Sequence, residues 1–181
     1  MKFRDLVVFS TVFSTVFFAI MQPASAQVRQ SEQTTRLVQS VADAFFDLLP
    51  KNDFAAERAF MSKSFALATP LRDWKAMRKL TIAENGSTPR YKAHQLTYYV
   101  RDTLLAAVDF SGQSSDPDTY ICGFVLWEIP AENTIGFFRM EQNVVTVPVF
   151  KKMPIQQAAQ LMTDWHCPMS LIETVLGLSG Q

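Results

Sequence analysis

Apolar residues recur every three or four positions in the first part of the chain, as they do along one face of an α-helix. This spacing predicts a helix over residues 35–49, which Pro50 ends. A second, shorter helix is predicted to run to Phe60, because Asn52 or Asp53 can cap its first turn. Both segments are amphipathic, so each is expected to bury one face.

A third helix is predicted between Thr69 and Gly86. Thr69 is a natural N-cap, Pro70 occupies the first helical position, and Asn85 and Gly86 form the end. Trp74 is predicted to lie on the inner stripe of this helix and to be a core residue rather than a ligand contact. Three other residues at helical spacing from Trp74 are expected on the same stripe, namely Leu71, Met77 and Arg78.

After Pro89 the pattern changes to β-forming residues in apolar and polar alternation. Short turns separate four such segments, so the strands are expected to pair antiparallel as a meander. Two helices are predicted after Pro148, with Pro168 as the break between them. The predicted strands cover residues 90–100, 104–111, 119–129 and 135–145, and the predicted tail helices cover residues 154–165 and 170–178.

This order predicts an α+β fold with three N-terminal helices packed on a curled four-stranded antiparallel meander sheet, followed by a helical tail. It resembles the cone fold shared by nuclear transport factor 2, ketosteroid isomerase and scytalone dehydratase. The sequence VADAFFDLL at 41–49, FAAE at 54–57 and Trp74 within 69–74 also look like a bacterial secreted family, domain of unknown function 4019. The resemblance covers roughly residues 37–145. It implies a cone fold and export, and it implies no chemistry because that family has no established activity.

The first 26 residues have the layout of a secretory signal peptide. Lys2 and Arg4 form a basic start, and residues 6–21 are uncharged. Small residues at 24–26 precede Gln27, which predicts cleavage between Ala26 and Gln27. The alternative is an uncleaved anchor, but a bilayer-spanning helix needs about 20 apolar residues, more than this run supplies.

Cleavage divides the chain into a leader, 1–26, and a mature part that begins with a polar, aperiodic segment, 27–33, expected to be disordered. The α+β cone domain is assigned to residues 34–147 and the tail, packed on the sheet, to residues 148–181. No membrane span is expected after cleavage.

The charge balance argues against nucleic-acid binding. The chain has 17 basic and 17 acidic residues, and loss of the leader leaves 15 and 16, a net charge of −1. Nucleic-acid-binding proteins usually carry a basic footprint that is absent here. Arg72, Lys75 and Lys79 are grouped, but helical spacing places them on a solvated face.

The two cysteines, Cys122 and Cys167, lie in the third predicted strand and in the tail. In an oxidising compartment an even count predicts a disulfide, which would tie the tail to the sheet. The alternative is that Cys122, in an apolar strand, is a buried free thiol. We predict the disulfide because the oxidising compartment is a stronger indication than the apolar surroundings of Cys122.

No catalytic, cofactor-binding or metal-binding residue is predicted. A site for zinc usually needs three or four His and Cys ligands, and the chain has only His94 and His166 as histidines. Phosphate-binding glycine loops and nucleophile-elbow motifs are absent from the sequence.

The cone fold nevertheless directs attention to carboxylates and tyrosines on the strands, because ketosteroid isomerase uses such a pair. Alternation places Tyr98 and Tyr99 on opposite faces. Asp109 is expected to project toward solvent, away from the face of Val108 and Phe110. The interpretation is the polar face of an amphipathic sheet rather than an acid–base dyad. The side chains considered are Tyr98, Tyr99, Asp109, Tyr120 and Glu128.

Apolar side chains on the strands form a candidate pocket, with sheet core as the alternative. Both faces of residues 122–129 are apolar, which predicts a strand covered on both sides, by the tail or by the partner of a homodimer through the sheet. The candidate pocket consists of Phe124, Leu126, Phe137 and Met140, with Trp127 and Phe138 on the opposite face.

These features predict an exported module, periplasmic or secreted, that is not an enzyme. It would bind a protein or a small lipophilic ligand through an apolar pocket or a sheet face. One alternative is a hydrolase, isomerase or dehydratase with a pocket carboxylate. The other is a component of an envelope assembly, held by an uncleaved anchor.

Overall fold

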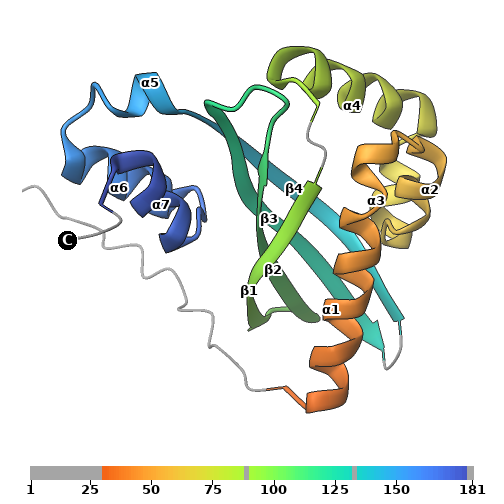
Figure 1. The fold of residues 1–181 in the computed structure, drawn as a ribbon. Helices are drawn as coiled ribbons and strands as arrows, with labels where there is room; N and C mark the ends of the chain where they lie inside the picture. The colour runs from red at the N-terminus through yellow and green to blue at the C-terminus, as the bar shows by residue number, and fades with distance from the viewer. Residues whose placement is uncertain (1–29, 88–89, 132–133, 179–181) are drawn as a thin grey trace, which may run out of the picture.

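A four-stranded antiparallel sheet separates two groups of helices in the computed structural model of the protein, which describes residues 30–87, 90–131 and 134–178 (Figure 1). The strands neighbour one another in chain order and the sheet is open, which confirms the predicted meander and the α+β class. The predicted leader and its cleavage site lie outside the described residues. The strands are β1 (Arg90–Val100), β2 (Leu104–Gln113), β3 (Thr119–Ala131) and β4 (Thr134–Thr146).

The N-terminal helices begin earlier and are more numerous than predicted. The side chain of Ser31 accepts a hydrogen bond from the Thr34 N–H at 3.1 Å, so the first helix starts inside the segment expected to be disordered. It ends at Phe46, and a short 3-10 turn carries the chain through Pro50. The elements are α1 (Glu32–Phe46), η1 (Leu49–Lys51), α2 (Phe54–Ala59), α3 (Lys63–Ala68) and α4 (Leu71–Asn85).

The sequence had predicted that Thr69 caps α4, and this prediction is wrong. The reason is the additional helix α3, which ends at this point of the chain. Ser62 caps α3 by accepting a hydrogen bond from the Phe65 N–H at 3.3 Å. The N–H of Thr69 then closes the end of α3 by donating to the Phe65 carbonyl oxygen at 2.8 Å. Pro70 is therefore the N-cap of α4, and its carbonyl oxygen accepts from the Trp74 N–H at 3.0 Å.

The helix α1 and the inner face of the sheet enclose an aromatic core. The ring of Phe45 lies 4.8 Å from Phe137 and meets Trp127 edge-on, with the ring centroids 5.7 Å apart. Phe46 packs on Phe110 at 5.2 Å. Such contacts between large buried rings contribute strongly to stability. Side chains therefore fill the concave side of the sheet.

The prediction that Trp74 is a core residue is confirmed, since it is 1% exposed and its ring lies 5.7 Å from Phe137. The prediction that Leu71 and Met77 share its buried stripe is wrong, because they are 42% and 48% exposed. The buried stripe runs instead from Trp74 to Arg78, one turn later, and both side chains bond to a carboxylate on α2.

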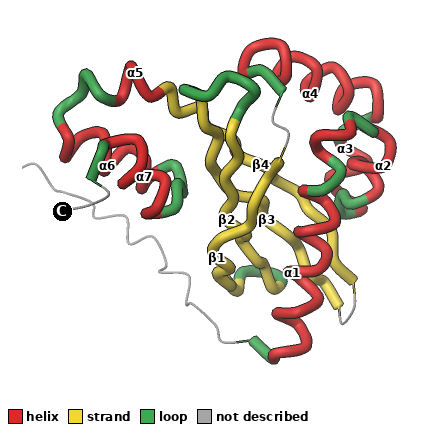
Figure 2. The backbone as a smooth tube through the Cα atoms, in the orientation of Figure 1, coloured by secondary structure: helices red, strands yellow, loops and turns green. Residues whose placement is uncertain are grey.

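The C-terminal helices cover part of the outer face of the sheet, on the side opposite α1 (Figure 2). The predicted disulfide joins Cys122 of β3 to Cys167 of the tail, with the Cα atoms 5.1 Å apart. The fully buried side chains of Val145 and Met162 complete this second core. The tail helices are α5 (Val147–Phe150), which was not predicted, α6 (Ile155–Asp164) and α7 (Met169–Leu176).

Candidate functional site

A cleft of about 560 Å³ lies between the outer face of β1 and β2 and the tail helices. The strands supply one wall, and the end of α6, the link to α7 and the first turns of α7 supply the other. The lining is mainly polar on the strand side and mainly apolar on the α7 side. It comprises His94, Gln95, Thr97, Tyr99, Asp109, Thr163, His166, Cys167, Pro168, Met169 and Ile172.

A β-bulge in β1 brings two consecutive polar residues to this cleft. Ala93 pairs with Phe110 and Leu96 pairs with Val108, so two residues of β1 stand opposite one residue of β2. A regular strand would send consecutive side chains to opposite faces, and a bulge interrupts that alternation. The two residues of the bulge, His94 and Gln95, both line the cleft.

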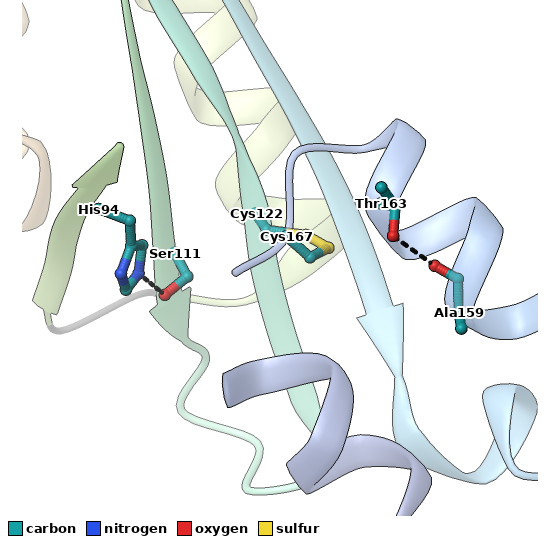
Figure 3. Close-up of a disulfide and its surroundings, with 6 residues drawn as sticks. All are labelled: His94, Ser111, Cys122, Ala159, Thr163 and Cys167. Carbon is teal, nitrogen blue, oxygen red and sulfur yellow. Dashed lines mark hydrogen bonds between the residues drawn. A yellow bond between two sulfur atoms is a disulfide. The ribbon is translucent and has the colours of Figure 1, made fainter. Parts of the chain in front are cut away.

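His94 is held by the neighbouring strand. Its Nε2 lies 2.6 Å from Oγ of Ser111, and the pair sits beside the disulfide of Cys122 and Cys167 (Figure 3). Partial burial lowers the pKa of His94 below its usual range, and the positive charge of Lys92 adds to this effect. The neutral imidazole is therefore favoured, and it offers one N–H donor and one nitrogen acceptor.

A second imidazole enters the cleft from the tail. Nδ1 of His166 lies 3.0 Å from Oδ1 of Asp109, and the imidazole packs on Phe124 with the ring centroids 4.8 Å apart. His166 has a φ of 60°, a left-handed conformation that is uncommon outside glycine. The next residue, Cys167, holds it there through the disulfide and through its N–H, which donates to the Met162 carbonyl oxygen at 2.9 Å.

The expectation that Asp109 faces solvent is wrong. It does point away from the core face, but the tail covers it and leaves its side chain 17% exposed. Burial raises the pKa of Asp109, and the nearby imidazole of His166 opposes that shift. The pair is therefore a partly buried acid and base on two elements that are far apart in the sequence.

The arrangement can form many hydrogen bonds but offers few charges. Its lining contains one carboxylate and two imidazoles, together with hydroxyl and amide groups, and it contains no lysine or arginine. Within the part of the chain that the structure describes, no three His, Cys, Asp or Glu side chains are grouped so as to hold a metal ion.

The residues of the predicted apolar pocket do not come together. Trp127 pairs with Phe137 and Leu126 pairs with Arg139, so Phe138 is left as a bulge in β4. Because of that extra residue, Phe137 and Met140 both lie on the core side, together with Trp127, which had been placed on the opposite face. The other two members, Phe124 and Leu126, lie on the outer face.

The strand tyrosines lie on opposite faces, as predicted for Tyr98 and Tyr99. Tyr98 is buried in the core, and its hydroxyl donates to Oγ1 of Thr35 at 3.3 Å, whereas Tyr99 lines the cleft. Tyr120 packs against the core beneath the tail. Glu128 lies in a different groove, beside α3. Sequence reasoning did not single out the other cleft residues as candidates, among them Gln95, Thr97, Thr163, Met169 and Ile172.

Comparison with known proteins does not assign a family. No protein-family model matches the chain, and no curated protein matches it. Among solved structures, Bd1075 of Bdellovibrio bacteriovorus aligns with a TM-score of 0.40 and 15% identity, over 61% of this chain and 38% of that protein. The resemblance to domain of unknown function 4019 and to the cone fold therefore stays a prediction. None of the described helices is long and apolar enough to cross a bilayer.

Proposed function

We propose that the protein is an exported binding module, and that its ligand site is the cleft between β1, β2 and the tail. The observation that carries this proposal is the bulge that brings His94 and Gln95 together at the cleft, opposite Asp109. Bulges are enriched beside functional sites, where they redirect side chains.

Two further features support a built site. The left-handed backbone of His166 carries a conformational cost, and such residues cluster at ligand sites. The cleft, at about 560 Å³, has the volume typical of small-molecule sites. The concave side of the sheet, where the sequence had suggested an apolar pocket, is occupied by Phe45, Trp127 and Phe137.

Export is supported by the cysteines and by the leader pattern. Disulfides persist in periplasmic and extracellular compartments and are rare in reducing ones. The bond between Cys122 and Cys167 fits that environment. It also fixes one wall of the cleft, because Cys167 follows His166 directly.

The test is a fragment screen observed by two-dimensional NMR of the isotope-labelled protein without its leader. We expect fragments to shift the amide signals of His94, Gln95 and Tyr99. Thr163→Trp places a large side chain at the rim and should abolish these shifts. Thr174→Trp is the matched control, because both threonines are exposed on tail helices and donate to the carbonyl four residues earlier, at 2.9 Å and 2.7 Å.

The proposal would be contradicted if fragments shifted the amide signals of the cleft equally in Thr163→Trp and in Thr174→Trp. Hits confined to the groove beside α3, which involves Met61 and Leu67, would contradict it as well. An absence of hits at the cleft from a chemically diverse library would also remove it.

A second candidate function is ester hydrolysis beside the cleft, favoured by the 2.6 Å contact between Nε2 of His94, which lines the cleft, and Oγ of Ser111, which does not. The hydroxyl oxygen would attack an ester carbonyl carbon while its proton passes to the neutral imidazole. The imidazole would return that proton to the departing alkoxide, and water would then release the acyl group as an acid. A fluorophosphonate probe should label Ser111 and leave Ser111→Ala unlabelled; no labelling of the folded protein would exclude this chemistry.

A further inference from the structure

We infer that the ligand of the cleft is a neutral, hydroxyl-rich molecule, that is, a carbohydrate. This inference rests on the proposed function, because it names the ligand class of the same site. It is argued from the charges, the hydrogen-bonding groups and the apolar side chains that line the cleft.

The charges argue against anionic and cationic ligands. Phosphate and carboxylate groups are normally bound by arginine or lysine, and neither lines the cleft. An anion would also face the carboxylate of Asp109. A cation would find only that one carboxylate, and its Oδ1 is already 3.0 Å from Nδ1 of His166.

The hydrogen-bonding groups match hydroxyls well. A hydroxyl both donates and accepts, so it is bound best where donors and acceptors alternate closely. The bulge sets the amide of Gln95, which has both functions, beside the imidazole of His94. Asp109 stands opposite as an acceptor, and the hydroxyl of Thr97 lies two residues further along β1.

The apolar part of the lining suits the C–H surface of a sugar ring. Tyr99 supplies an aromatic ring with a polar hydroxyl, the kind of side chain that packs on a ligand while remaining partly hydrated. On the facing wall, Met169 is 65% exposed at the start of α7, and Ile172 lies one turn further on. A sugar between these walls would have polar edges toward the strands and an apolar face toward α7.

The groove beside α3 provides a contrast within the same molecule. Its volume is about 570 Å³, close to that of the cleft, but its lining includes Met61, Leu67, Pro130 and Ile135. A lipophilic ligand would prefer that groove. The cleft and the groove are nearly equal in volume but differ in lining. The ligand class can therefore be tested by where a probe binds as well as by how tightly it binds.

The experiment titrates the labelled protein without its leader with neutral trisaccharides built from glucose, galactose or N-acetylglucosamine. Glucose 6-phosphate and octanoate serve as the anionic and lipophilic probes. We expect saturable shifts at His94, Gln95 and Tyr99 with at least one trisaccharide. Tyr99→Ala, which removes the ring, should lose affinity by about tenfold or more, and Tyr99→Phe, which keeps the ring, should lose clearly less.

The outcomes separate this inference from the proposed function. If fragments bind the cleft but all three trisaccharides fail, or if glucose 6-phosphate or octanoate binds there more tightly, the ligand class is wrong and the binding function stands. Trisaccharide binding that is unchanged in both Tyr99→Ala and Thr163→Trp would place the sugar elsewhere and overturn the inference. Failure of every fragment at the cleft would remove the proposed function itself.

Discussion

The indole Nε1 of Trp74 donates a hydrogen bond to Oε2 of Glu57 over 2.9 Å, and so links α4 to α2 inside the protein. Nε of Arg78 donates to the same oxygen over 3.0 Å. The carboxylate is fully buried, and its other oxygen, Oε1, has no hydrogen-bond partner among the residues described. A buried charge is tolerated only when paired, so both donors are expected to matter for stability.

Replacing Trp74 should therefore cost stability in two steps. Trp74→Phe keeps a ring against Phe137 but removes the donor to Glu57, and should lower the unfolding free energy by about 1.5–3 kcal/mol. Trp74→Ala removes the ring as well and should cost about 3–5 kcal/mol. Urea unfolding followed by circular dichroism measures both. Met77→Ala, on the exposed side of the same helix, is the control. If Trp74→Ala were as stable as Met77→Ala, the core role of Trp74 would be refuted.

The buried carboxyl also predicts a pH dependence. Burial raises the pKa of Glu57 above its ordinary value of 4.5, against the opposing effects of Arg78 and Trp74. Because the folded protein then holds this proton more tightly than the unfolded chain does, the contribution to stability is largest below pH 4.5 and is lost as the pH rises through the folded pKa.

The variant Glu57→Gln keeps an oxygen acceptor but does not titrate. We expect the unfolding free energy of the wild type, minus that of the variant, to fall as the pH rises from about 4 into the neutral range. Chemical unfolding at several pH values measures this difference. A difference that stays constant, or rises with pH, would show that the folded pKa of Glu57 is not raised.

Loss of the disulfide should loosen the tail without abolishing the sheet. For a sequence separation of 45 residues, the chain-entropy relation gives an upper figure of about 4 kcal/mol for Cys167→Ser. Hydrogen exchange should accelerate in α6 and α7 and change little in β2. Thiol titration of the denatured, unreduced protein should detect no free thiol; two free thiols per chain would mean that the bond does not form.

The predicted leader is tested by the N-terminus of the protein isolated from the cell envelope fraction. We expect the first residue to be Gln27, because Ala24 and Ala26 fit the small-residue positions of the cleavage site. Ala26→Asp should block processing and leave a heavier precursor. Wild-type protein that still begins at Met1 would favour the uncleaved anchor instead.

Local patterns in the sequence were sufficient for most of the secondary structure. Helical spacing and turn residues predicted the order of helices, strands and tail, because these signals act over a few neighbouring residues. The same reasoning missed α3 and misplaced the cap of α4. Ser and Thr residues can lie at either end of a helix, and here Ser62 begins α3 whereas Thr69 ends it. Part of the cleft also left a local trace: core residues Ala93 and Leu96 are separated by two polar residues, which breaks the alternation expected of a strand.

By itself, the sequence determined most of the element types, the meander and the burial of Trp74, and it favoured a disulfide between its two cysteines. Only the tertiary structure decided where the tail lies on the sheet, and hence that His166 meets Asp109, 57 residues away. It also decided which aromatic residues share a face, because the bulge at Phe138 reverses the alternation of β4. Periodicity describes neighbours along the chain, whereas a cleft is formed by side chains that folding brings together from distant segments.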